Sequence, residues 1–451
     1  GDTITLDETL TDTLVIEKDL TIQGIDDDAI LRSSSLSAIT IAANRTVVIQ
    51  NIRVERIGCD TRGIELEEGA SLSLTDSTLA TGFETFNQEG GGISAPSRVG
   101  DITLERVTFE GVSAVPLFLY DSVGDVTLTD VLFDHTRANE GGGAIKALQG
   151  EFSLTMNRVT FDHVSGSGTG SVITVSAVNL ICDGCVFHAP FAEFGTVIYF
   201  SGNNATFQFL NSTVCGAEGG AIQTGYAQGL VISGSTFVGG GGFYPQVEAG
   251  GVSIVVQNNS FIGFGGPEQV LEVSGDANTI ENNLFWSNDA PYDVVATPVN
   301  TVLSYNWLQG SNRVQGVFTN ATNIETGANP MLRAWTDDGD CSNDSLYPAW
   351  NSPLIDAGSP GILDPDGSRS DIGGAGGPYA EPFLHADQDG DGYTAVQDCN
   401  DDNGGLAPNQ PEICDGIDND CDEFVDDLDD SVWSYPWYPD CDLDGWGWWY
   451  D

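Results

Sequence analysis

Acidic side chains recur at a regular spacing near the end of this chain, in the stretch DQDGDGYTAVQD at residues 387–398. Aspartate occupies positions 1, 3, 5 and 12 of this twelve-residue stretch, at Asp387, Asp389, Asp391 and Asp398. Gly392 at position 6 permits a sharp turn, and Tyr393 at position 7 offers its backbone carbonyl. Because hard divalent cations take oxygen donors at this spacing, the stretch predicts a calcium loop. The alternative is a solvated turn of Asp and Gly.

Two further stretches repeat the frame. DCDLDGWGWWYD predicts a second calcium loop, with the backbone carbonyl of Trp446 at position 7 and carboxylates from Asp440, Asp442, Asp444 and Asp451. DNDCDEFVDDLD offers a middle set of carboxylates, Asp418, Asp420, Asp422 and Asp429. Glu423 stands in this middle copy where a turn glycine is expected. The middle stretch is therefore a weaker candidate than the two that flank it.

The charge balance limits the partners of the chain. There are 67 acidic and 14 basic residues in 451, and the net charge is −53. This balance argues against nucleic acid, because phosphates require Lys and Arg to neutralise them. It also argues against polyuronate substrates. Without an apolar stretch of 18 residues, no direct membrane insertion is expected. Cations, and calcium in particular, are the natural partners of such a chain.

Cysteines cluster in the same acidic tail, at Cys399, Cys414, Cys421 and Cys441. Such a cluster is typical of small secreted modules held by disulfides. Four cysteines allow three pairings, and the spacing does not choose among them. Elsewhere, Cys182 and Cys185 form a CDGC stretch, which we interpret as a structural disulfide or packed thiols in preference to a redox pair.

The first 310 residues are dominated by a repeat of about 25 residues. One column of apolar residues follows short turns, at Phe109, Phe133, Phe161, Phe187, Val214, Phe237, Phe261 and Phe285. A second column precedes the first in constant phase, at Ile93, Leu117, Ile145, Ile173, Ile198, Ile222, Val247 and Leu271. The runs between them alternate with a period of two, which indicates strands. We therefore predict about a dozen stacked coils of a parallel β-solenoid, with the phenylalanine column pointing inward.

The columns and their GGAI-type stretches resemble the right-handed parallel β-helix of secreted bacterial proteins, including polymorphic outer-membrane-type repeats. The stretch NSPLIDAGSPGILDPDGSRSDIGGAGG resembles a terminal segment that closes such helices in surface-anchored proteins. The resemblance implies an all-β fold in three parts: a right-handed parallel β-helix over 1–310, final irregular coils and a cap over 311–380, and a small Asp/Cys-rich calcium-loop module over 381–451.

The tail resembles a Cys-containing metal-binding repeat of secreted bacterial proteins, through DQDGDGY, DCND, PEICDG and DNDCD. That family includes a copper-associated surface protein, so copper is the alternative metal. Copper prefers imidazole and sulfur ligands, whereas this tail holds one histidine, His385, and its cysteines are expected to be bridged. Calcium is accordingly the preferred cofactor.

One pair of carboxylates outside the tail could do chemistry. Asp134 and Asp162 follow the turns of consecutive coils, in a column with Glu110 and His188. Their expected separation of roughly 5 Å matches that of a retaining glycosidase. The competing interpretation is a ladder of like residues produced by the repeat. The signatures of polygalacturonases are absent, and few Arg or Lys residues are present to serve a lyase.

Together these patterns favour a structural or adhesive β-helix protein, secreted or at a cell surface and of bacterial type, over an enzyme. A subunit of an extracellular fibre is one form of this prediction, with other copies of the chain or a surface glycan as partners. The alternatives are a carbohydrate-active glycoside hydrolase or lyase and a copper-binding surface protein.

Overall fold

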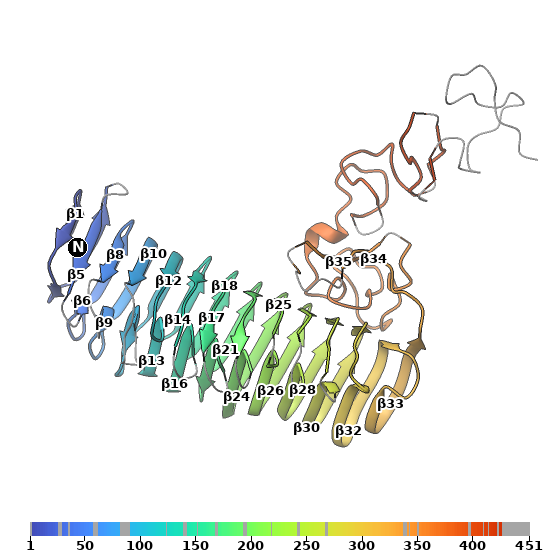
Figure 1. Ribbon diagram of the computed structural model, residues 1–451, viewed down its shortest axis with the longest axis horizontal. Coiled ribbons are helices and arrows are strands. Elements are labelled where there is room, and N and C mark those ends of the chain that lie inside the picture. The colour runs from blue at the N-terminus through green and yellow to red at the C-terminus, as the bar shows by residue number, and fades with distance from the viewer. Residues whose placement is uncertain are drawn as a thin grey trace, which may run out of the picture.

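The protein is a parallel β-solenoid, drawn from end to end in Figure 1. The computed structural model describes residues 2–25, 29–34, 37–56, 62–81, 91–122, 124–138, 142–150, 152–166, 170–192, 196–217, 219–240, 244–266, 269–336, 341, 343–349, 351–395, 398–408, 410–413, 415–421 and 424–425. Within them, 31 strands form one continuous sheet that winds through three ladders, and every pairing in this sheet is parallel. The predicted all-β parallel solenoid is confirmed, and its right-handedness stays a prediction.

Each ladder takes one stretch from every coil. The first contains β1 (Asp2–Leu6), β4 (Leu20–Gly24), β7 (Thr46–Gln50), β10 (Ser71–Thr81), β12 (Ile102–Glu110), β14 (Val126–Thr129), β17 (Ser153–Asn157), β21 (Asn179–Asp183), β24 (Ile198–Leu210), β26 (Ile222–Ser233), β28 (Val247–Gln257), β30 (Gln269–Glu281), β32 (Tyr292–Gln309) and β33 (Val314–Thr326). The second contains β2 (Leu10–Thr11), β5 (Ile30–Ser33), β8 (Arg53–Arg56), β15 (Leu132–Asp134), β18 (Thr160–Asp162), β22 (Val186–His188), β25 (Thr213–Cys215), β27 (Thr236–Val238), β29 (Ser260–Ile262) and β31 (Leu284–Trp286). The third contains β3 (Leu14–Ile16), β6 (Ser37–Ile41), β9 (Arg62–Leu66), β11 (Ile93–Ala95), β13 (Leu117–Ser122), β16 (Ile145–Gly150) and β20 (Ile173–Ser176). The long strands each continue through at least two ladders, and β32 continues through all three. β19 (Ser165–Gly166) pairs separately with β23 (Phe191–Ala192).

The predicted phenylalanine column lies inside the rod. All its members are buried, and Phe133 stacks on Phe109 and Phe161 with ring centroids 4.7 and 5.1 Å apart. Where Val214 interrupts the column, Phe209 from another ladder reaches in between Phe187 and Phe237. The second apolar column is also buried along its length. Both predicted columns are therefore confirmed as the core of the solenoid.

Polar residues are also stacked inside the rod, at the turn before the phenylalanine column. Asn259, Asn283 and Asn306 form an amide ladder. The side-chain oxygens of Asn283 and Asn306 each accept from the side-chain and backbone N–H groups of the preceding rung at 2.9 to 3.0 Å. Asn258 and Asn282 directly precede Asn259 and Asn283 of this ladder. Both have a positive φ, which turns the chain sharply before the ladder residue. Buried amides without these partners would each cost free energy.

The segment after β33 lies against the side of the rod. Its antiparallel pair, β34 (Leu332–Ala334) and β35 (Ser345–Pro348), is drawn above the later coils in Figure 1. Gly373 N–H donates to the Asn282 carbonyl, and Asn258 donates to the Asp371 carbonyl, each at 2.8 Å. A disulfide joins Cys215 of a coil to Cys341 of the segment. The boundaries of the three predicted parts stay a prediction.

A short helix, η1 (Pro382–His385), leads from this segment into the acidic module. Across the described ranges, no helix is both long and apolar enough to cross a membrane. Cys182 and Cys185 form a buried disulfide inside the solenoid, as the structural interpretation of CDGC predicts.

Candidate metal centre

The predicted calcium loop folds as a series of turns in which side-chain oxygens accept from the backbone. Asp387 accepts from the N–H groups of Gly390 and Gly392, at 2.6 and 3.0 Å. Both glycines have φ values that favour glycine, 81° and 101°, which is the role expected of Gly392. Aspartates form such turns readily because their short side chains reach the backbone two residues on.

Three aspartates of the loop each have one carboxylate oxygen without a hydrogen-bond partner. The Oδ1 atoms of Asp389, Asp391 and Asp398 accept from backbone N–H groups two residues further on, at 3.2, 2.9 and 2.9 Å. Their Oδ2 atoms are buried and have no hydrogen-bond partner. Ligand oxygens of Asp387, Asp389 and Asp391 all lie within 4.8 Å of one another. A buried carboxylate oxygen without a donor is costly, and a cation removes that cost.

Asp398 closes the loop from a buried position. Burial raises the pKa of its carboxyl, and the negative charges of Asp391 and Asp389 raise it further. The carboxyl at position 12 thus experiences the negative charges at positions 3 and 5. Tyr393 donates its backbone N–H to Asp391 from position 7. Ligand oxygens of Asp387, Asp389 and Asp391 thus lie together, whereas that of Asp398 lies within 4.8 Å of the Cys399 and Cys421 sulfur atoms. The role of the five residues as ligands stays a prediction.

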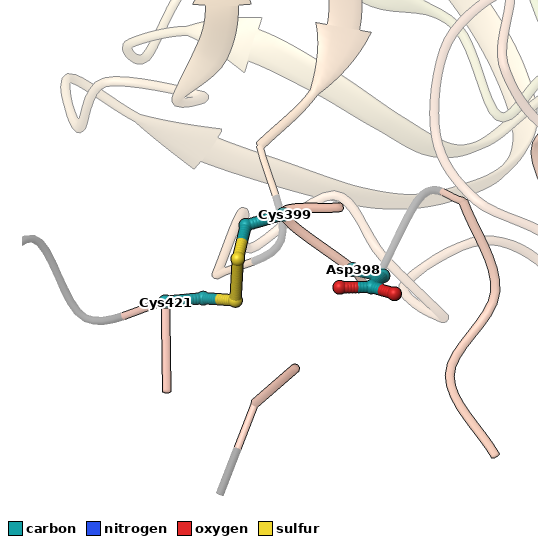
Figure 2. A group of neighbouring side chains, drawn as sticks. All are labelled: Asp398, Cys399 and Cys421. Atoms are coloured by element: carbon teal, nitrogen blue, oxygen red, sulfur yellow. A yellow bond between two sulfur atoms is a disulfide. The ribbon is translucent and has the colours of Figure 1, made fainter. Parts of the chain in front are cut away.

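The adjacent cysteine is bridged. Cys399 forms a disulfide with Cys421, and Figure 2 shows the bridge next to the Asp398 carboxylate. This is one of the three pairings that the sequence left open, and Cys414 and Cys441 lie outside the described residues. Because a bridged sulfur is not a thiolate, the described donors of the loop are oxygens, which suit calcium better than copper.

The middle stretch contributes a second acidic group. Asp418 and Asp420 lie with Glu412 so that ligand oxygens of all three are within 4.8 Å of one another. Glu412 was missed by the sequence reasoning, although it lies in the PEICDG stretch, and its carboxylate accepts from Asn419 N–H at 2.8 Å. The remaining predicted ligands lie outside the described residues: Asp422, Asp429, Asp440, Asp442, Asp444, Trp446 and Asp451.

The segment after β33 contacts the loop at 387–398. Arg333 in β34 donates from Nη2 to the carbonyl of Ala395, inside the loop, and from Nε to Pro348 at 3.2 Å. His385 hydrogen-bonds through Nε2 to the Ala375 carbonyl at 2.9 Å. No sequence signal connects Arg333 to a loop about sixty residues further along the chain, so this contact could not be predicted from spacing.

Buried acids surround His385. Asp364 and Asp371 are buried with it, and ligand atoms of the three residues lie within 4.8 Å of one another. Burial raises the pKa of Asp371 to about 8, although the Asp356 N–H donates to its carboxylate. Both oxygens of Asp364 accept from backbone N–H groups, those of Asp371 and Gly377. These hydrogen bonds all lie within the segment after β33, so the three residues are explained as part of the packing of that segment.

The two candidate catalytic carboxylates occupy successive rungs of one ladder. Asp134 pairs with Asp162, and Asp162 pairs with His188, as the repeat predicts. Each carboxylate bonds to the histidine that follows it, Asp134 to His135 and Asp162 to His163. A catalytic role for the pair stays a prediction.

Comparison with known proteins matches the module but not the rod. Residues 398–427 match the family Cu-binding_MopE, described as "Putative metal-binding motif". No curated protein and no solved structure matches the chain. The chain therefore combines a parallel β-solenoid with a C-terminal metal-binding motif that contains a disulfide. The match starts at Asp398, which is the last residue of the acidic loop at 387–398.

Proposed function

We propose that the C-terminal module binds calcium through the loop at 387–398 and folds around it. The observation that carries the proposal is the set of three buried Oδ2 atoms without partners, in Asp389, Asp391 and Asp398. Binding a divalent cation there satisfies these oxygens and offsets the repulsion among the acids of a chain with net charge −53. Binding free energy then becomes folding free energy of the module.

Copper is the second candidate, because the matched family carries copper in its name. Copper(II) favours imidazole nitrogen. The one histidine of this region, His385, is buried and hydrogen-bonds to the Ala375 carbonyl. The candidate ligand atoms without hydrogen-bond partners are carboxylate oxygens, and such ligands favour calcium.

The test is metal binding to the whole protein after chelation. Calorimetric titrations with Ca²⁺, Mg²⁺ and Cu²⁺ are paired with hydrogen exchange of peptides covering 381–395. We expect Ca²⁺ to bind and to slow exchange in these peptides, while the circular dichroism of the solenoid stays unchanged. If Cu²⁺ protects the loop and Ca²⁺ does not, the copper alternative replaces this proposal.

For the whole chain we propose a structural role outside the cell, as a secreted or surface-displayed rod with adhesive or fibre-forming contacts. Three disulfides among the described residues support an oxidising compartment. Parallel coils stacked through backbone hydrogen bonds supply a rigid spacer. Protease shaving of intact source cells and electron microscopy of the extracted material test the location and the polymeric state. Protein that resists shaving until the cells are lysed contradicts the proposed location.

A further inference from the structure

Three of the four histidines of this chain lie on adjacent coils of the solenoid. His135 and His163 follow β15 and β18 directly, and His188 ends β22. The rings of His135 and His163 stack with their centroids 4.9 Å apart and their planes 7° apart. His188 occupies the next rung of the neighbouring aspartate column, paired with Asp162.

The backbone turns both side chains of each Asp-His pair toward solvent. In an extended strand, successive side chains point to opposite faces. His135 and His163 instead have a φ of 50°, in the left-handed region, and this breaks the alternation. The His135 and His163 side chains are 65% and 58% exposed, beside aspartates that are about one-third exposed. The result is an exposed strip of imidazoles backed by carboxylates.

The hydrogen bonds within each pair prepare the imidazoles as ligands. Nδ1 of His135 bonds to Asp134 Oδ1, and Nδ1 of His163 bonds to Asp162 Oδ1 at 2.8 Å. In the neutral ring the proton then lies on Nδ1, and Nε2 keeps its lone pair. This carboxylate–histidine arrangement is the one that orients metal-binding histidines and increases their basicity.

The strip has defined ends. On one side, the Glu110 carboxylate of the same column bonds Arg53 at 2.8 Å. On the other, Ala189 follows His188 at the position that His135 and His163 hold in the preceding coils, so their column ends after two rungs. The strip thus places three of the four histidines of the chain on consecutive coils.

We propose that His135, His163 and His188 form a surface site for a borderline transition-metal ion, Zn²⁺ or Cu²⁺. Imidazole donors suit these ions. A metal lies about 2.0–2.1 Å from each ligating nitrogen, so the two stacked rings must tilt their Nε2 atoms toward each other. Such side-chain rotations are available because both rings are exposed. His188 supplies the third imidazole from the next rung. This site is separate from the oxygen-donor loop at 387–398.

The test uses the full chain at pH 8 in saturating Ca²⁺, which fills the carboxylate sites first. The pH is chosen because the Asp134 bond raises the pKa of His135 and protons compete with the metal. Cu²⁺ is followed by electron spin echo modulation, which detects the remote nitrogen of a bound imidazole, and Zn²⁺ by calorimetry.

The variants are His135→Gln with His163→Gln, His188→Gln alone, and Asp134→Asn with Asp162→Asn. We expect the first to abolish imidazole modulation, the second to weaken binding at least tenfold, and the third to weaken it about 10–100-fold, as for carboxylates behind other metal-bound histidines. Tyr120→Phe, an exposed change on another ladder, is the matched control and leaves binding unchanged. Imidazole modulation that is absent in the parent, or that persists in the double glutamine variant, overturns the proposal. Unchanged binding in His188→Gln removes the third ligand.

Discussion

Replacing Asp398 by Asn distinguishes two interpretations of the loop at 387–398, a cation-binding site and an acidic turn that binds no metal. The change removes one charge and keeps an Oδ1 that accepts from the Asn400 N–H, now made at 2.9 Å. In place of the Oδ2 atom without a partner it puts an amide N–H₂, a donor in the electrostatic field of the negative Asp391 and Asp389 side chains. One buried polar atom without a partner costs about 1–3 kcal/mol. The metal-free loop of the variant should therefore be more stable than that of the parent by a similar amount.

Calcium binding should change in the opposite direction. A calcium ligand oxygen becomes an amide, and the charge at the site falls by one. A loss of about 1.4–3 kcal/mol corresponds to about a 10–100-fold higher Kd. We expect calorimetry to show this loss, and hydrogen exchange in chelator to show slower opening of residues 387–395 than in the parent.

The matched control is Asp415→Asn, which removes the same charge from an exposed acid outside the loop and keeps an oxygen for the Ile417 N–H. It should change calcium affinity only through long-range charge, by less than about threefold at 0.15 M salt, because exposed charges are screened. Equal effects of the two substitutions on Kd, or a metal-free loop that is destabilised by Asp398→Asn, would refute the reasoning.

Three further predictions concern the rod and the docked segment. Phe161→Ala removes a buried ring stacked at 4.4 Å on Phe187 and should lower the free energy of unfolding by about 3–5 kcal/mol, measured in denaturant, with Phe161→Leu costing less. Asn283→Leu leaves the backbone N–H of Asn259 without its acceptor at a cost of about 1–3 kcal/mol, while the Asn259 side chain still donates to the carbonyls of Ile232 and Gln257. Faster exchange of the Asn259 backbone amide should report this loss. Burial raises the pKa of the Asp371 carboxyl from an ordinary 3.8 to about 8, so this group binds its proton more tightly in the folded state. Docking of 351–385 should thus be strongest below about pH 4 and weaken by about 1.4 kcal/mol per unit up to pH 8. Proteolysis across this range should show that trend, and Asp371→Asn should flatten it.

The repeat was readable from sequence because each coil is a local unit. Alternation places Phe133 and Ile145 on inward positions, and the period of about 25 residues brings equivalent positions of successive coils into register. The turns of the acidic loop at 387–398 were predictable for the same reason, since the hydrogen bonds of Asp387 and Asp391 reach residues two to five positions away. Short-range spacing carries enough information to predict such contacts.

Only the tertiary structure decided the contacts between distant segments. The Phe209 ring lies between Phe187 and Phe237, where Val214 interrupts the column, because the coils pack Phe209 of another ladder against that position. The repeat does not specify this contact. Arg333 reaches the carbonyl of Ala395 only because the segment after β33 folds back along the rod. Sequence spacing constrains neighbours within a turn or a coil. Docking depends on complementary surfaces formed after the coils have stacked, and these surfaces leave no periodic signal.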